Sequence, residues 1–141
     1  DGKTWKDIAK SLDLRWQKGF TFHPTKTGTI YLAASTPPKF PQGGVYKTTN
    51  NGKTWKQVLS RKKIGTGILQ VYSVDIHPTK PNIVYACTAA GLWCSRNDGK
   101  TWKMMKVPHF RTTHVTVDPK DPEVIYCTTF GGGTWVGYYL P

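Results

Sequence analysis

The sequence has few acidic residues. Eight Asp and Glu stand against twenty Lys and Arg, which gives a net charge of +12 at pH 7, and Glu123 is the only glutamate. Such an excess of positive charge favours solubility or acidic partners, and the sign alone does not choose between them. It also leaves few carboxylates from which an acid–base site could be built.

Long apolar runs and strong helix formers are also scarce. No run approaches the ~18 residues that a membrane-spanning helix needs, so we expect no membrane insertion. Ala and Leu are sparse, while Thr, Val, Ile and Tyr are plentiful beside 14 Gly and 10 Pro. This balance disfavours helices, and an aromatic content of 13% is enough to build a core. The 141 residues therefore predict an all-β fold, as one domain or a piece of one.

Cysteine is limited to three residues, Cys87, Cys94 and Cys127. An odd number cannot pair completely within one chain, and no CxxC spacing suggests a metal site. Cys87 and Cys94 flank a short turn and could face each other across a hairpin, but a disulfide there is not the favoured reading. His23, His77, His109 and His114 are scattered, so we expect neither a metal nor a cofactor.

A five-residue segment, Gly-Lys-Thr-Trp-Lys, occurs three times, at 2–6, 52–56 and 99–103. Its tryptophans are 50 and 47 residues apart, and other landmarks recur in the same order. They are His-Pro or Asp-Pro, then Ile-Tyr or Val-Tyr, then Gly-x-aromatic. Four short β-type segments in a period of 40–50 residues indicate the blade of a β-propeller, a four-stranded antiparallel sheet.

The repeat predicts the strands of about three blades, lettered A to D from the propeller axis outward. Strand A covers 18–23, 72–77 and 113–117; B covers 29–34, 83–88 and 124–129; C covers 44–48, 91–95 and 134–139; D covers 4–8, 54–59 and 101–107. The predicted order is D, ABCD, ABCD, ABC. The corresponding repeats lie at approximately 1–12, 13–60, 61–107 and 108–141 of a single unit, 1–141.

The turn before strand D has the pattern Ser/Thr-x-Asn-x-Gly-x-Thr-Trp at 48–55 and 95–102. A hydroxyl followed by an Asx and a Gly suits a tight turn, because side-chain oxygens accept backbone N–H bonds and Gly adopts positive φ. The pattern resembles the Asp-box, or bacterial neuraminidase repeat, with Asn in place of the Asp. The residues that match are Thr48, Asn50, Gly52, Trp55, Ser95, Asn97, Gly99 and Trp102.

This resemblance implies a propeller like those of sialidases, xyloglucan-degrading glycosidases, sortilin-type receptors and photosystem assembly factors. It implies that the box residues are structural and lie on the face away from the ligand. It also favours an extracytoplasmic or secreted location. A fold shared by so many functions does not name one of them.

Candidate catalytic residues are few. Asp75, in a predicted strand A, is the one weak candidate for an acid, and a structural role is the stronger reading. In the xyloglucan-degrading enzymes that the chain resembles, a catalytic Asp follows a Tyr-x-x-Thr motif. Ala89 stands at that position here. The Arg cluster and Arg-Ile-Pro motif of sialidases are also missing, so any catalytic acids would lie outside this segment.

The D–A and B–C loops share one face of a propeller, and here they carry cations interleaved with aromatic residues, which suit sugars and carboxylates. The candidate binding residues are Arg15, Trp16, Phe40, Arg61, Lys62, Lys63, His109, Phe110 and Arg111. We expect a non-catalytic recognition or scaffold unit for a glycan, an acidic polymer or a protein. The alternatives are a glycoside hydrolase fragment and an assembly factor or receptor. No nucleic-acid motif is present.

Three blades of ordinary twist cannot close a ring, so two apolar sheet faces should be left open. We expect further blades to cover them. These would come from a longer chain or from a second copy in a homodimer.

Overall fold

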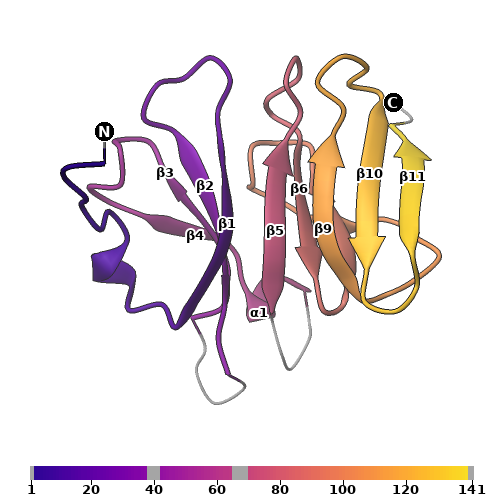
Figure 1. Ribbon diagram of the computed structural model, residues 1–141, viewed down its shortest axis with the longest axis horizontal. Helices are drawn as coiled ribbons and strands as arrows, with labels where there is room; N and C mark the ends of the chain where they lie inside the picture. The colour runs from indigo at the N-terminus through magenta and orange to yellow at the C-terminus, as the bar shows by residue number, and fades with distance from the viewer. Residues whose placement is uncertain (1, 38–41, 65–69, 140–141) are drawn as a thin grey trace.

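The computed structural model describes residues 2–37, 42–64 and 70–139, and forms three antiparallel sheets placed side by side (Figure 1). The first sheet contains β1 (Trp16–Phe22), β2 (Ile30–Ser35), β3 (Gly44–Thr48) and β4 (Lys56–Leu59); the second contains β5 (Val71–Ile76), β6 (Val84–Thr88), β7 (Gly91–Ser95) and β8 (Lys103–Met104); the third contains β9 (Thr112–Val117), β10 (Val124–Thr129) and β11 (Thr134–Tyr138). In each sheet the strands pair in chain order, which is the meander of a propeller blade. The predicted all-β fold with two complete blades and one ABC blade is confirmed.

The predicted first strand D, residues 4–8, is wrong: residues 2–8 form no strand. A strand needs a hydrogen-bonded neighbour, and no strand C of a preceding blade lies beside this segment in the part of the chain that is described. The strand D predicted for 101–107 is reduced to β8, two residues long. Two short helical turns were not predicted, η1 (Lys10–Leu12) and α1 (Arg61–Ile64). Neither they nor any other described helix has the length and apolarity to cross a membrane.

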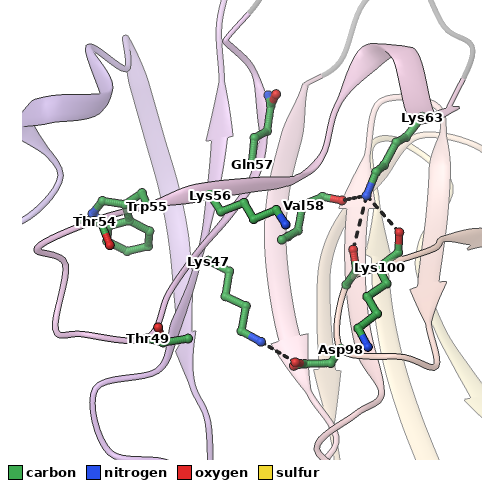
Figure 2. Close-up of a pocket in the computed structure, with 11 residues that line it drawn as sticks. Lys47, Thr49, Thr54, Trp55, Lys56, Gln57, Val58, Lys63, Asp98 and Lys100 are labelled. Atoms are coloured by element: carbon green, nitrogen blue, oxygen red, sulfur yellow. Dashed lines mark hydrogen bonds and ion pairs between the residues drawn. The ribbon is translucent and has the colours of Figure 1, made fainter.

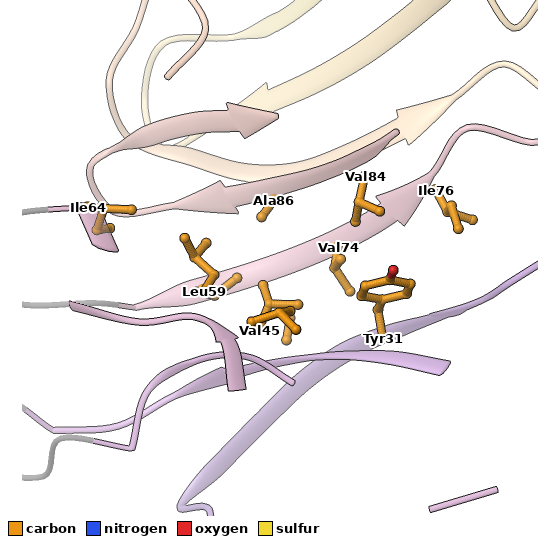
Figure 3. Close-up of a cluster of buried hydrophobic side chains, with 11 residues drawn as sticks. Tyr31, Val45, Leu59, Ile64, Val74, Ile76, Val84 and Ala86 are labelled. Atoms are coloured by element: carbon orange, nitrogen blue, oxygen red, sulfur yellow. The ribbon is translucent and has the colours of Figure 1, made fainter. Parts of the chain in front are cut away.

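The first blade boundary is an apolar layer between the sheets β1–β4 and β5–β8 (Figure 3). Alternation along each strand sends every second side chain to this layer. Tyr31 and Ala33 of β2 and Val45 of β3 face Val74 of β5 and Ala86 of β6, all nearly or fully buried. Burying such side chains contributes about 25 cal/mol per Å² of apolar surface, so blade stacking is the main source of cohesion.

The second boundary repeats this arrangement one blade later. Tyr85, Cys87 and Leu92 of the second sheet pack against Val115 and Cys127 of the third sheet. All three cysteines are free thiols, and Cys94 is buried in the same cluster. Cys87 pairs in register with Leu92, so it does not face Cys94 across the hairpin, and the disulfide considered from the sequence is not formed.

The two outer faces differ. On the first blade, the segment that precedes β1 packs Ala9, Leu12 and Leu14 over the outer side of β2 and β3, while Phe20 and Phe22 remain exposed. On the outer face of the third blade, exposed apolar side chains are spread over β10 and β11: Tyr126, Val136 and Tyr138. The expectation of two open faces therefore needs one correction, because the first face is partly covered by the chain itself.

Candidate functional site

The turn at 48–55 is held by its own side chains. Thr48 Oγ1 accepts hydrogen bonds from the backbone N–H of Asn50 (3.2 Å) and Gly52 (3.0 Å). Asn50 Oδ1 accepts the backbone N–H of Thr54 at 2.9 Å, and Asn50 Nδ2 donates to the Thr54 hydroxyl at 2.9 Å. The last bond explains how Asn substitutes for the usual Asp, because its amide donates to the hydroxyl where a carboxylate would accept.

The turn at 95–102 repeats these bonds with nearly the same distances. The partners are Ser95 with Asn97 and Gly99, and Asn97 with Thr101. Each turn is also tied to the A–B connection of its own blade: Asn51 N–H donates to Gly28 O, and Asp98 N–H donates to Asn82 O. The A–B connections lie along the upper edge of Figure 1, opposite the lower edge that carries α1 and the β10–β11 connection.

The box tryptophans connect neighbouring blades. The indole N–H of Trp102 donates to the carbonyl of Val58 in β4 at 3.0 Å, and the indole N–H of Trp55 donates to the carbonyl of Ile8 at 2.8 Å. Ile8 and Val58 occupy the same place in the repeat. The segment around Ile8 therefore lies where the outer strand of a preceding blade would lie, although it forms no sheet.

A groove of about 470 Å³ separates β4 from the box of the second blade (Figure 2). It is lined by Lys47, Lys56, Lys63 and Lys100, which makes it a candidate anion site that the sequence did not suggest. Two of these cations are already bound within the protein. Lys47 lies 2.5 Å from Asp98 Oδ2, and Lys63 donates to three backbone carbonyls, those of Val58 (2.8 Å), Lys100 (3.0 Å) and Gly99 (3.5 Å).

The predicted binding residues are distributed along the lower edge of the arc. Arg15 and Trp16 lie at the start of β1, and the Lys18 ammonium lies 5.8 Å from the Trp16 ring centroid. The short helix α1 at the second blade contains Arg61, Lys62 and Lys63. Lys63 points into the groove between β4 and the box of the second blade. Phe40 lies outside the described residues.

The third blade gathers the remaining predicted residues into one cluster, formed by His109, Phe110, Arg111 and Phe130, which we term the third-blade loop cluster. The rings of His109 and Phe110 are stacked, with centroids 5.2 Å apart and planes at 9°. The Phe130 N–H donates to the Arg111 carbonyl at 2.9 Å, which joins the D–A loop to the B–C loop. A Cβ at Gly132 would lie 2.5 Å from the His109 ring, so the ring needs glycine there. Phe110 and Phe130 are 65% and 69% exposed.

Asp75 sits on β5 at the centre of the arc, and both of its carboxylate oxygens accept hydrogen bonds. Oδ1 accepts from the Thr21 hydroxyl (3.1 Å) and the Ile76 N–H (2.9 Å), and Oδ2 accepts from the Val117 N–H (2.9 Å). These partners lie on all three blades. Ala89 lies in the β6–β7 turn and offers only its backbone, whose N–H donates to Gln70 O.

The two His-Pro turns are closed by neutral imidazoles. His23 Nδ1 accepts from the Lys26 N–H at 3.1 Å, and His77 Nδ1 accepts from the Lys80 N–H at 3.1 Å. Burial, followed by the charge of the nearby lysine, lowers the pKa of both histidines below 6.5. Among the described residues, no group of three or more His, Cys, Asp or Glu could hold a metal ion.

Comparison with protein families decides the relationship. The model of the Sortilin-Vps10 family (sortilin, neurotensin receptor 3) matches residues 1–134. The chain belongs to this family. None of the curated proteins matches it.

Solved structures similar to this Sortilin-Vps10 chain share its propeller fold at low identity. One is the GH74 enzyme of Niastella koreensis (21% identity, TM-score 0.70), with 86% of this chain covering 21% of that one. A second is the GH74 xyloglucanase of Xanthomonas campestris, with 18% identity and a TM-score of 0.65. The match covers 92% of this chain and 23% of the xyloglucanase. A third is YCF48 bound to D1 peptide, with 12% identity and a TM-score of 0.60. The match covers 86% of this chain and 37% of the YCF48 chain. The chain thus spans about a fifth to little more than a third of the length of these three structures.

Proposed function

We propose that this chain is a non-catalytic recognition part of a Sortilin-Vps10 propeller and binds an acidic chain on its D–A and B–C loop face. The observation that carries the proposal is the third-blade loop cluster, which contains two exposed phenyl rings, Phe110 and Phe130, and the exposed Arg111, whose carbonyl accepts the Phe130 N–H. A guanidinium gives paired hydrogen bonds to a carboxylate, and aromatic faces bind the apolar part of a peptide or sugar. The net charge of +12 adds long-range attraction for an acidic ligand.

An acidic polypeptide is the first candidate ligand. The neighbour YCF48 has been solved with a bound D1 peptide, which is a precedent for peptide binding on this fold. A glycan is the second candidate, because two similar structures are GH74 enzymes and one of these is a xyloglucanase. In either case the cluster offers stacking surface and a cation.

A role as part of a glycoside hydrolase is the competing proposal, and it needs acids supplied by other blades. Asp75 is poorly suited to proton transfer, because its oxygens accept three hydrogen bonds that hold the three blades together. Ala89 offers no carboxylate. A hydrolase of this type would lose activity on replacement of acids elsewhere, and would not depend on Asp75 for proton transfer.

We also propose that further blades complete the propeller. Tyr31, Tyr85 and Tyr126 occupy equivalent positions in the three strands β2, β6 and β10. The first two are fully buried because the next blade covers them, and Tyr126 is 41% exposed. The uncovered side of the third blade is therefore a surface of the kind that blades bury in this fold, and its cover would come from a longer chain or a second copy.

Binding measurements with three probes test the recognition proposal: a ten-residue polyglutamate peptide, a xyloglucan oligosaccharide and a heparin oligosaccharide. The variants Phe110→Ala and Arg111→Ala should each weaken binding of the preferred probe about tenfold, as for a central contact residue. The control is the triple variant Lys3→Ala/Lys53→Ala/Lys100→Ala, which removes more charge outside the cluster. An equal loss in the control, or binding of none of the probes, would refute the site.

A further inference from the structure

Two cysteines face each other across the second blade boundary. Cys87 of β6 and Cys127 of β10 have sulfur atoms 3.8 Å apart, and the side chains are 0% and 4% exposed. The third cysteine, Cys94, is also buried, but its sulfur contacts the carbonyl of Ser95 at 3.6 Å instead of another thiol. The sequence analysis considered only the pair Cys87 and Cys94, which it did not favour, because it compared neighbours along one hairpin.

The repeat shows that this pair occupies a special place. Counted from the tyrosine shared by β2, β6 and β10, Cys87 stands where Ala33 stands in the first blade. Cys127 stands where Ala86 stands in the second blade. Ala33 and Ala86 are both fully buried in the layer at the first boundary. Two facing positions that are both alanine at the first boundary are thus both cysteine at the second.

We propose that Cys87 and Cys127 form a disulfide that joins the second blade to the third. The oxidant is a disulfide of the thiol-exchange class, such as oxidised glutathione. One cysteine thiolate attacks a sulfur of the oxidant and releases one glutathione thiolate, and the second cysteine then displaces the other from the mixed disulfide. The two cysteines lose two protons and two electrons in total, and the oxidant becomes two thiols.

The geometry needs only a small adjustment. A disulfide bond is about 2.05 Å long, so the sulfur atoms must approach by about 2 Å, which rotation of the two side chains can supply. In the S–H···S contact, the hydrogen bond to Cys127 raises the pKa of Cys87, and burial raises it further. The same bond lowers the pKa of Cys127. Because both residues are buried in the folded chain, exchange takes place while the third blade is still docking.

The cross-link would act on the boundary between the second and third blades. The third blade is joined to the second by the apolar layer and by a few polar bonds, such as the Ser73 hydroxyl with the Val115 carbonyl at 3.4 Å. A covalent bond between β6 and β10 closes a loop of about 40 residues in the unfolded chain and so lowers its entropy. We expect the thermal midpoint of the oxidised chain to exceed that of the reduced chain by about 5–10 °C.

Peptide mapping of the full 141-residue chain, refolded with a glutathione redox buffer and alkylated without reduction, tests the proposal. The expected product is one peptide pair that joins Cys87 to Cys127, with Cys94 alkylated. The proposal would be overturned by a Cys87–Cys94 pair, by a Cys94–Cys127 pair, or by alkylation of all three cysteines.

Two variants make the result specific. The double variant Cys87→Ala/Cys127→Ala copies the Ala33 and Ala86 pair and should fold, but its thermal midpoint should not respond to reductant. The control Cys94→Ala removes a buried thiol of the same cluster and should keep both the cross-linked peptide and the response to reductant. If the double variant and the wild type respond equally to reductant, the proposed disulfide does not stabilise the chain and the proposal fails.

Discussion

Tyr31 donates its hydroxyl hydrogen to the carboxylate of Asp98, so that the centre of the first blade is bonded to the box turn of the second. Lys47 binds the other carboxylate oxygen, and its ammonium lies 5.3 Å from the Tyr31 ring centroid. Burial opposes ionisation of Asp98, but the hydrogen bonds from Lys47 and Tyr31 outweigh it and hold the pKa of Asp98 below its ordinary value. The box turn therefore has a role beyond its own hairpin, since Asp98 bonds the second blade to the first.

Replacement of Asp98 should destabilise the chain more than a comparable change in the first box. Asp98→Ala leaves the Tyr31 hydroxyl and the Lys47 ammonium without their acceptor, and should cost about 1–3 kcal/mol in free energy of unfolding. The control is Asn51→Ala, which replaces the equivalent turn residue with a similar positive φ, 56° against 62°. Urea unfolding of both variants and of Tyr31→Phe measures the effect. Equal losses for Asp98→Ala and Asn51→Ala would show that backbone strain, not the bridge, is responsible.

Glycine in the box is needed for two reasons that a pair of variants separates. Gly99 has φ +83°, and an added Cβ would lie 3.2 Å from Val58 Cβ of the preceding blade. Gly131 has nearly the same φ, +81°, with nothing within 4 Å. Gly131→Ala should cost about 1–2 kcal/mol for the left-handed backbone alone. Gly99→Ala should cost about 1–3 kcal/mol more, because it also pushes two blades apart. Urea unfolding measures the difference in free energy of unfolding between Gly99→Ala and Gly131→Ala. Equal losses would mean that the contact with Val58 relaxes to accept a methyl group at Gly99 at little cost.

The blade pattern could be predicted from sequence because each landmark is a local turn signal repeated at a fixed period. Eleven of the twelve predicted strands lie within a few residues of those described. The failure at 4–8 has a physical reason: a strand D needs a hydrogen-bonded neighbour. The residues that follow the same Lys-Thr-Trp segment in the next repeat form β4 (Lys56–Leu59), where β3 lies beside them. The helical turn α1 was missed because four residues carry no periodicity to detect.

The candidate site was less predictable. His109, Phe110 and Arg111 are adjacent in sequence, so their grouping was foreseeable, but Phe130 joined them through a loop pairing that no local pattern encodes. Lys63 was grouped with Arg61 and Lys62 as a ligand-binding cation. Its acceptors are carbonyls of β4 and of the next blade's box, and backbone acceptors leave no trace in side-chain composition.

Stability should fall on mild acidification because of the two His-Pro turns. The pKa of His23 and of His77 is lowered in the folded chain, by burial first and by a lysine second. The unfolded chain takes up protons as the pH falls below 6.5, while the folded histidines stay neutral. Their stabilising contribution is therefore complete above pH 6.5 and is lost as the pH falls through the lower folded pKa values.

The variant His23→Asn/His77→Asn isolates this effect. Asparagine keeps an acceptor in the turn, as Asp118 does in the third blade, and does not titrate. Between pH 7 and pH 5 the wild type should lose about 2–4 °C more in thermal midpoint than the variant. Parallel curves for the two proteins would refute the assignment.

The last prediction concerns the uncovered side of the third blade. Tyr126, Val136 and Tyr138 share one face of the sheet, because Val136 lies opposite Tyr126 and Tyr138 lies opposite Val124 in the antiparallel pairing. The hydroxyl of Tyr85, one blade earlier, is buried and has no partner among the described residues, whereas the equivalent Tyr31 bonds Asp98 of a following box. The first blade thus receives both a bond to a following box and a covering sheet. Among the described residues, the second blade lacks the bond, and the third blade lacks the covering sheet.

The isolated chain should self-associate through this face as its concentration rises, and light scattering should report the increase in mass. Val136→Lys/Tyr138→Lys should suppress association without lowering the thermal midpoint, because both side chains are exposed at 54% and 67%. The variant Phe20→Lys/Phe22→Lys on the first blade shows how two copies associate. If it also suppresses association, the third blade of one copy stacks on the first blade of the next, as in a propeller ring. If it has no effect, two third blades form a symmetric pair. A stable monomer that binds no hydrophobic dye would show that the chain needs no cover at all.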